Sequence, residues 1–412
     1  RAMMAAKAAV RGQVKVKSGF LAAGGRRRVQ RRMRRLGVRI GAALLLASAA
    51  GCASMSLDVG YYWQSITGHL TVMREARPID ELIADPSTTE ALRARLAAVN
   101  AIRGFASRSL GLPDNGSYTR YADLKRPSVL WNVFATPELS LQLEQWCFPV
   151  AGCISYRGYY AKATADAYAQ TLRARGLDVQ VAGVTAYSTL GWFDDPVLNT
   201  FIGYPEGELA RLLFHELAHQ VVYVKGDTRF NESFATAVEQ AGVERWLAER
   251  NSETLTRGYR EYDGRRRDFV ALLKRHRDVL EAAYRNGADE DERRRAKTRV
   301  FAALQHDYLA LKQSWGGYSG YDRWFGQGVT NAHLAAVATY TDLVPGFLRL
   351  LAEQGGDLRR FYAACRELAL LPKDERDRLL GAPSAEMQAG DSAPADARAS
   401  GTRFQSPSSP GT

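Results

Sequence analysis

Residues 214–220 read Phe-His-Glu-Leu-Ala-His-Gln, which places two histidines, His215 and His219, four residues apart. On an α-helix with 3.6 residues per turn, this spacing brings both imidazoles to one face, one turn apart. Two imidazoles so placed can bind one Zn²⁺, and Glu216 beside them can accept a proton from a water on the metal. The sequence therefore predicts a metal-binding helix with Glu216 as general base.

A zinc site needs a third protein ligand, and the chain offers one shortly afterwards. Residues 231–235 read Asn-Glu-Ser-Phe-Ala, and a short polar turn at 225–227 separates them from the histidines. Two antiparallel helices joined by this turn would bring Glu232 to the open side of the histidine pair. We therefore expect one zinc ion, bound by His215, His219 and Glu232. The alternative is an ordinary amphipathic helix with two capped core histidines, which would need other buried partners.

The positive charge of the chain is concentrated at its start. The 412 residues include 56 Lys and Arg and 44 Asp and Glu, for a formal net charge of +12. Residues 1–51 contain thirteen Lys and Arg and no acid, so removing these thirteen charges from +12 leaves −1 on the rest. The folded part is thus close to neutral, and we expect no nucleic-acid binding.

Residues 1–51 follow the order of a leader segment. A basic run at 31–35 precedes a short apolar run at 40–50, which ends in small residues before Cys52. The apolar run suits a signal peptide and is too short to span a membrane. We expect a lipid anchor on Cys52 and a periplasm-facing protein of the outer membrane, since Ala53 is not an acidic retention signal; a plain secretory signal is the alternative. Met33 fits as the start of translation, with residues 1–32 lying upstream.

The other cysteines suggest an oxidising compartment. Cys147 and Cys153 flank a five-residue loop, short enough to close as a disulfide. A second zinc site at this pair is the alternative, but it lacks partners at ligand spacing. Cys365 lies in an apolar helical pattern, and we expect a buried free thiol there.

Apolar periodicity predicts a predominantly helical α+β chain. Helical patterns occur at 61–110, 161–175, 262–285, 289–314, 331–340, 344–352 and 358–370. Strand-like runs, rich in β-branched and aromatic residues, occur at 128–135, 154–160 and 179–184. We expect one domain over residues 52–380, with a small mixed sheet between 128 and 193 and a helical C-terminal half. The tail at 381–412 is rich in Ser, Pro, Ala, Gly and Asp, and we expect it to be disordered.

The motifs together carry a resemblance to a known family. The His-Glu-x-x-His helix, Glu232, the lipoprotein leader and the Cys-Phe-Pro-Val-Ala-Gly-Cys loop resemble the zinc aminopeptidases described as lipoproteins of proteobacteria, over about residues 52–372. More broadly, the helix pair resembles that of gluzincin zinc peptidases. The resemblance implies a zincin-like fold, His215, His219 and Glu232 as zinc ligands, and Glu216 as the base that hydrolyses a peptide substrate.

The chain departs from the best-known aminopeptidases in two respects. The interval to Glu232 is shorter, and no Gly-Ala-Met-Glu-Asn-type segment precedes the zinc helix to hold a substrate's free amine. Asp194, Asp195 and Glu206 are candidate replacements. Peptide hydrolysis is therefore better supported than exopeptidase action.

The resemblance also implies a strand that binds substrate. In such peptidases an edge strand beside the metal pairs with the substrate backbone. Residues 187–193 are our candidate strand, and an ordinary edge strand stopped by Pro196 is the alternative. The substrate-binding residues would be Tyr187, Ser188, Thr189, Leu190 and Gly191.

Two further roles remain to be filled. An oxyanion donor is needed, and the candidates are His333 and two tyrosines, Tyr318 and Tyr321, of the glycine-aromatic loop at residues 315–321. Glu239, seven residues beyond Glu232, is a candidate partner that orients a histidine. The leading hypothesis is a zinc-dependent peptidase; the alternative is a non-catalytic zinc-binding lipoprotein that binds peptides or envelope partners and has no need of Glu216 as a base. The sequence does not indicate an oligomeric state.

Overall fold

The structure is a computed structural model that describes residues 60–381, apart from 149–151, 187, 327 and 338–341. The leader and tail predicted from the sequence, including Cys52, lie outside the described residues. The chain divides into two compact units, and of the first, residues 1–64, only the helical residues 60–64 are described. All structural features below belong to the second unit.

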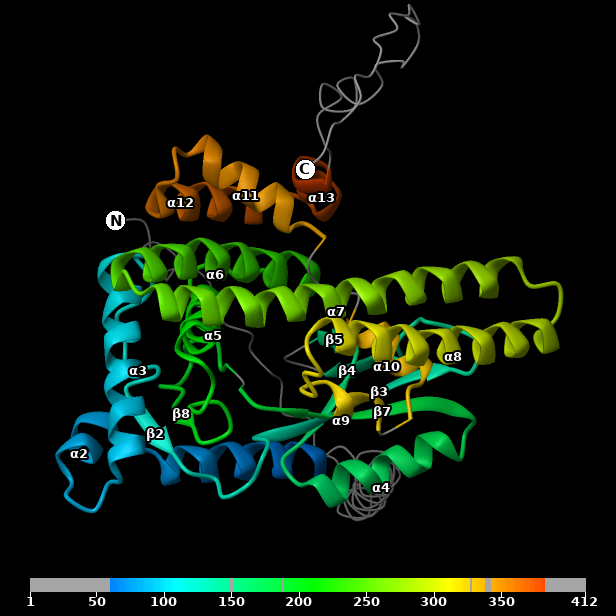
Figure 1. Ribbon diagram of the computed structural model, residues 1–412, viewed down its shortest axis with the longest axis horizontal. Coiled ribbons are helices and arrows are strands. Elements are labelled where there is room, and N and C mark those ends of the chain that lie inside the picture. Colours follow the sequence, from blue (N-terminus) through cyan, green and yellow to red (C-terminus); the bar gives the residue numbers. More distant parts are fainter. Residues whose placement is uncertain (1–59, 149–151, 187, 327, 338–341, 382–412) are drawn as a thin grey trace, which may run out of the picture. The chain divides into compact units, whose positions relative to one another are not determined.

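The second unit is mostly helical, as the sequence predicts (Figure 1). Residues 65–75 are helical, and the labelled helices are α2 (Ile79–Ala84), α3 (Glu90–Arg108), α4 (Lys162–Arg173), α5 (Glu206–Ala218), α6 (Thr228–Arg250), α7 (Glu253–Asn286), α8 (Glu290–Ser314), α9 (Asp322–Phe325), α10 (Asn331–Val337), α11 (Val344–Glu353), α12 (Leu358–Ala369) and α13 (Lys373–Gly381).

The strands of the described residues form three small sheets, so the single mixed sheet expected at 128–193 is wrong. The largest has β3 (Leu130–Pro137) between β6 (Arg157–Tyr159) and β7 (Leu177–Val184), with antiparallel pairing throughout. The mixed pairing occurs elsewhere, where β2 (Arg120–Ala122) lies between antiparallel β1 (Arg77–Pro78) and parallel β8 (Val197–Leu198). The predominantly helical α+β class is confirmed.

The β6-β3-β7 sheet forms because β3 has an alternating pattern. Trp131, Val133 and Ala135 are buried, while residues between them are partly exposed. Period-2 alternation is typical of a strand with one covered face. Helices α4 and α10 both pack on this sheet.

A hairpin of β4 (Trp146–Phe148) and β5 (Gly152–Ile154) carries two of the cysteines. Cys147 lies opposite Cys153 in the strand register, and the two are joined as a disulfide. Cys365 on α12 is a buried free thiol.

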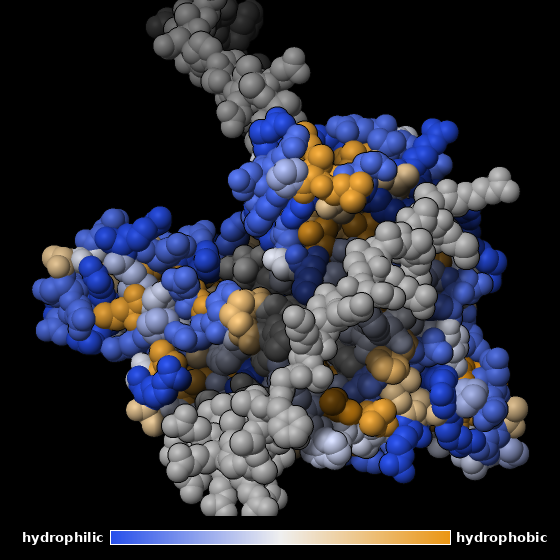
Figure 2. Space-filling model, turned by 180° about the vertical axis from the view of Figure 1, so that it is seen from behind, coloured by the Kyte–Doolittle hydropathy of each residue, from blue (hydrophilic) through white to orange (hydrophobic). Residues whose placement is uncertain are grey.

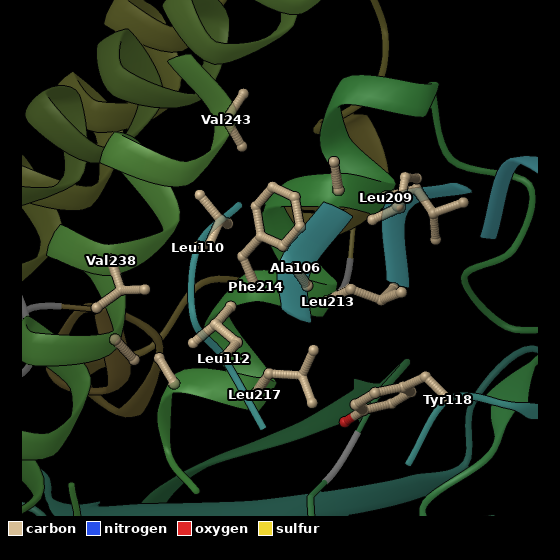
Figure 3. Close-up of a cluster of buried hydrophobic side chains, with 14 of the residues drawn as sticks. Ala106, Leu110, Leu112, Tyr118, Leu209, Leu213, Phe214, Leu217, Val238 and Val243 are labelled. Carbon is tan, nitrogen blue, oxygen red and sulfur yellow. The ribbon is translucent and has the colours of Figure 1, made fainter. Parts of the chain in front are cut away.

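The main core surrounds α5 and α6. Leu209, Leu213 and Leu217 recur every four residues and form the buried face of α5. Figure 3 shows these leucines beside Ala106 of α3 and Val238 of α6. Burial of this face orients the helix, and the polar residues of α5 must therefore lie on another side.

A second apolar cluster joins the long helices α7 and α8. Phe269 of α7 and Tyr308 of α8 lie in it, together with Phe325 of α9. Residues 287–289 connect the two helices, and Asp289 caps α8 by accepting from the Glu292 amide. On the face seen in Figure 2, hydrophilic residues cover most of the described surface and apolar residues form separate patches.

Candidate metal centre

Helix α5 carries a polar stripe on an otherwise apolar surface. Glu208, Arg211, His215 and His219 are spaced by three, four and four residues, so their side chains line one face. His219 is the cap residue that follows the last helical residue, Ala218, and its amide still donates to the His215 carbonyl. From α6, Glu232 and Glu239 are two turns apart and face this stripe.

The ligand atoms expected from the sequence converge on one point. His215 Nε2 lies 3.2 Å from His219 Nε2 and 3.2 Å from Glu232 Oε2. His219 Nε2 lies 3.6 Å from Glu232 Oε1. The ligand atoms of the three residues lie within 4.8 Å of one another, the arrangement of a metal-binding group.

These distances fit a tetrahedral zinc ion. With Zn–N bonds of about 2.0–2.1 Å and tetrahedral angles, two ligand atoms of one zinc ion are about 3.3 Å apart. The observed separations are close to this value: 3.2 Å between the two imidazole nitrogens, 3.2 Å from His215 Nε2 to Glu232 Oε2, and 3.6 Å from His219 Nε2 to the other carboxylate oxygen, Oε1. Three protein ligands would leave the fourth position of such an ion open, as in catalytic rather than structural zinc sites.

Local hydrogen bonds explain why Glu232 reaches the histidines. Asp227 caps the start of α6 by accepting from the Phe230 amide, and its other oxygen pairs with Arg376 of α13 at 2.7 Å. The buried Asn231 side chain both accepts from the Val224 amide and donates to the Val224 carbonyl, each at 2.8 Å. The link between α5 and α6 is thereby fixed immediately before Glu232.

Glu239 orients His215, as the sequence suggested. Its Oε2 atom lies 2.9 Å from His215 Nδ1 and accepts from Arg211 Nη1 at 2.7 Å. A histidine whose Nδ1 is held by a carboxylate directs Nε2 toward a metal. In contrast, His219 Nδ1 is buried and has no hydrogen-bond partner among the described residues.

The electrostatics of the cluster favour a cation. Burial disfavours a charged His215, but hydrogen bonds to Glu232 and Glu239 outweigh it and raise its pKa to about 10 in the metal-free protein. Burial, together with the neighbouring His215, lowers the pKa of His219 to about 4. The same carboxylates that attract a proton to His215 would attract a metal ion in its place.

Glu216 lies beside the ligands with its side chain partly exposed. Burial raises its pKa to about 7, and the charges of Glu232, Asp195 and Glu239 add to the effect of burial, while His215 opposes it. A carboxylate with a pKa near the working pH can both accept and return a proton. Its position and pKa suit a general base.

The expected substrate strand at 187–193 is wrong, because residues 188–193 form a turn; Tyr187 lies outside the described residues. Leu190 and Gly191 have positive φ values of 57° and 80°, which an extended strand does not allow. Asp195 stabilises the turn by accepting from the Thr189 amide and hydroxyl at 2.7 and 3.0 Å. A Cβ on Gly191 would lie 3.2 Å from Gln220 Oε1, so the turn still borders the site.

The three candidate amine-binding acids do not converge on one point, because their side chains have different surroundings. Asp195 is buried, which raises its pKa to about 6, and its charge acts on Glu216. The Asp194 side chain lies against Gly116. Glu206 pairs with Arg250 at 3.0 Å, at the opposite end of α5 from His219.

The candidate oxyanion donors pack elsewhere. The Tyr321 ring stacks on Phe269 of α7 at 3.9 Å, within the second apolar cluster, and Tyr318 lies under Arg265. His333 on α10 packs against Trp324 at 5.3 Å, and its ring nitrogen bonds to Thr330. The structure therefore does not bring these side chains to the histidine pair.

Sequence reasoning missed two residues near the site. Tyr223, four residues after His219, is half-exposed, and its pKa is raised by burial and by the charge of Glu232. Arg211, four residues before His215, bonds to Glu239. Arg211 could have been found from the sequence, because a residue four positions before His215 lies on the same face of the helix. Tyr223 could not, because it lies in the link between α5 and α6, whose path the sequence does not specify.

The protein is a mostly helical α+β protein in which the His-Glu-x-x-His helix, α5, is paired with α6, the helix that carries Glu232 and Glu239. The model of a protein family described as "Putative aminopeptidase" matches residues 60–380. The match spans most of the chain, and the protein belongs to this family. No curated protein and no solved structure matches it. The family's description suggests peptidase activity.

Proposed function

We propose that this protein is a zinc-dependent peptidase, with aminopeptidase activity as its family suggests, on a zincin-like helix pair. The observation that supports the proposal most strongly is the convergence of His215, His219 and Glu232 at separations close to a tetrahedral edge. Glu216, on the same helix turn, supplies the proton-accepting group that hydrolysis requires.

Each residue has a stated role in the proposed reaction. A zinc ion held by His215, His219 and Glu232 would lower the pKa of a water to about 7 and polarise a substrate carbonyl. Glu216 would accept a proton from the attacking water and pass it to the leaving amine of the peptide. Glu239 holds the ring of His215 through Nδ1. The charge of Glu232 contributes to the raised pKa of the Tyr223 phenol. We therefore propose Tyr223 as the oxyanion donor, in place of the candidates Tyr318, Tyr321 and His333.

Metal removal tests the proposal directly. Dialysis against a chelator should abolish hydrolysis of unblocked peptides, and one equivalent of Zn²⁺ should restore it, because the water loses its activation without the metal. Peptide release is the measurement, and Mg²⁺ addition is the control, since this ion prefers oxygen ligands. Full activity after verified zinc removal would rule out the metal mechanism.

We also propose that the protein faces the periplasm as a lipoprotein anchored at Cys52 in the outer membrane. Among the described residues, no helix has the length and apolarity to cross a membrane. Cys52→Ser should move the protein from the membrane fraction to the soluble periplasmic fraction, because the thiol that would carry the lipid is gone. Immunoblots of fractionated cells measure this, with Cys365→Ser as control. A wild-type protein that is already soluble contradicts the anchor.

A further inference from the structure

A chain of buried charges leads away from the candidate ligands along the seam between α5 and α6. Beyond His215 come Glu239 and then Arg211, which donates to Glu239 at 2.7 Å. On its other side, Arg211 Nε lies 2.8 Å from both oxygens of Glu208. The Glu208 and Glu239 side chains are only 3% and 1% exposed.

Stability alone does not explain this chain of charges. Replacing a buried ion pair by well-packed apolar residues is often neutral or stabilising, because desolvation offsets the attraction between the charges. Apolar packing is available close by, because Leu212, next to Arg211 in the sequence, packs against the main apolar core and Val238, next to Glu239, lies in it. The ion pairs instead fix orientation, because the Arg211 guanidinium is held on one edge by Glu208 and on the other by Glu239.

The two histidines differ in how their rings are held. Glu239 reaches Nδ1 of His215, while Nδ1 of His219 has no partner among the described residues. A second guanidinium, Arg266 of α7, influences Glu239 by its charge, but its hydrogen bond is to Asp263 at 2.7 Å. Arg211 is thus the guanidinium that hydrogen-bonds to Glu239.

We propose that Arg211 is a positioning residue for the metal centre. Clamped by Glu208, it holds Glu239 in the orientation that keeps His215 Nε2 facing His219 and Glu232. Zinc affinity then depends on an arginine that touches no ligand atom and lies one turn before His215. This inference rests on the metal centre proposed above. It adds that Arg211 helps to determine the zinc affinity of that centre.

A double-mutant cycle tests the inference without any peptide. Zinc dissociation constants are measured by chelator competition for the wild type, Arg211→Lys, Glu239→Gln and the double variant. Outer-shell changes typically weaken metal binding by about 10- to 100-fold, and we expect each single variant to fall in this range. Because Arg211 acts through Glu239, the double variant should bind zinc no more than about 2-fold more weakly than Glu239→Gln.

Lys297→Gln is the matched control. Lys297 of α8 forms an ion pair with Asp178 of β7 at 2.7 Å, outside the α5–α6 pair, and its side chain is 17% exposed, like that of Arg211. It should lower the melting temperature and leave zinc affinity within about 2-fold. If Arg211→Lys fails to fold, Glu208→Gln releases the same clamp from its far side and should weaken zinc binding by about 3-fold or more.

The outcomes separate the inference from the proposed function. A folded Arg211→Lys variant with wild-type zinc affinity, or additive losses in the double variant, overturns the positioning role. A wild-type protein that binds no zinc overturns the proposed metal centre itself. A protein that binds zinc as expected but cleaves no peptide contradicts the peptidase proposal and leaves the role of Arg211 standing.

Discussion

Replacing Glu216 by Gln is expected to lower kcat for peptide hydrolysis by about 10²- to 10⁴-fold, the usual contribution of a general base. The amide keeps the size of the carboxylate but cannot accept a proton. Because Glu216 is not one of the three converging ligands, zinc content should stay at one equivalent. The measurement is steady-state cleavage of unblocked peptides at matched zinc content.

Glu206→Gln on the same helix is the control, since Glu206 pairs with Arg250 far from the histidines. It should retain wild-type kcat. Equal activity of the wild type and Glu216→Gln would place the base elsewhere. If neither protein cleaves any of a diverse peptide set, the alternative of a non-catalytic zinc-binding protein is favoured.

Glu232→Ala should weaken zinc binding by more than about 100-fold. Outer-shell changes alone cost up to about 100-fold, and this change removes a ligand, leaving two histidines that supply only two corners of the tetrahedron. The fold should survive, because the Glu232 side chain is 32% exposed and its helix is held by Asn231 and Asp227. Zinc content by metal analysis and the melting temperature are the two measurements.

Glu244→Ala provides the control, because Glu244 is an exposed acid on the same helix. It should leave zinc affinity unchanged. Wild-type affinity in Glu232→Ala would mean that the third ligand is another residue. His333 is not a ready substitute, since its ring packs against Trp324 and bonds to Thr330.

The helix pair and the convergence of His215, His219 and Glu232 were predictable because they depend on local rules. Histidines four apart share a helix face, and a short polar turn before Asn231 favours an antiparallel partner helix. The i+7 spacing of Glu239 from Glu232 follows the same rule, and the structure places Glu239 at His215. Apolar periodicity likewise located the long charged helices α7 and α8.

The errors arose where specific side-chain contacts, rather than local periodicity, decide the conformation. Residues 188–193 contain residues typical of strands, but Asp195 binds the Thr189 amide and stabilises a turn with positive φ at Leu190. The glycine-aromatic loop offered two phenols, yet Tyr321 stacks on Phe269 of α7. Pairing partners of short strands such as β8 depend on tertiary packing, so the division into three sheets was not predictable.

The cap of α6 has a consequence for how the site is acquired during synthesis. Asp227, five residues before Glu232, pairs with Arg376 on α13, the last helix described. Domains form from the N-terminal side as a chain is made, so α5 and α6 leave the ribosome before this guanidinium does. A nascent chain that ends at α12 already has both histidines and Glu232. It still lacks Arg376, the buried partner of Asp227 at the start of α6. Full ordering of the candidate site is therefore tied to the synthesis of α13, well over 100 residues after Glu232.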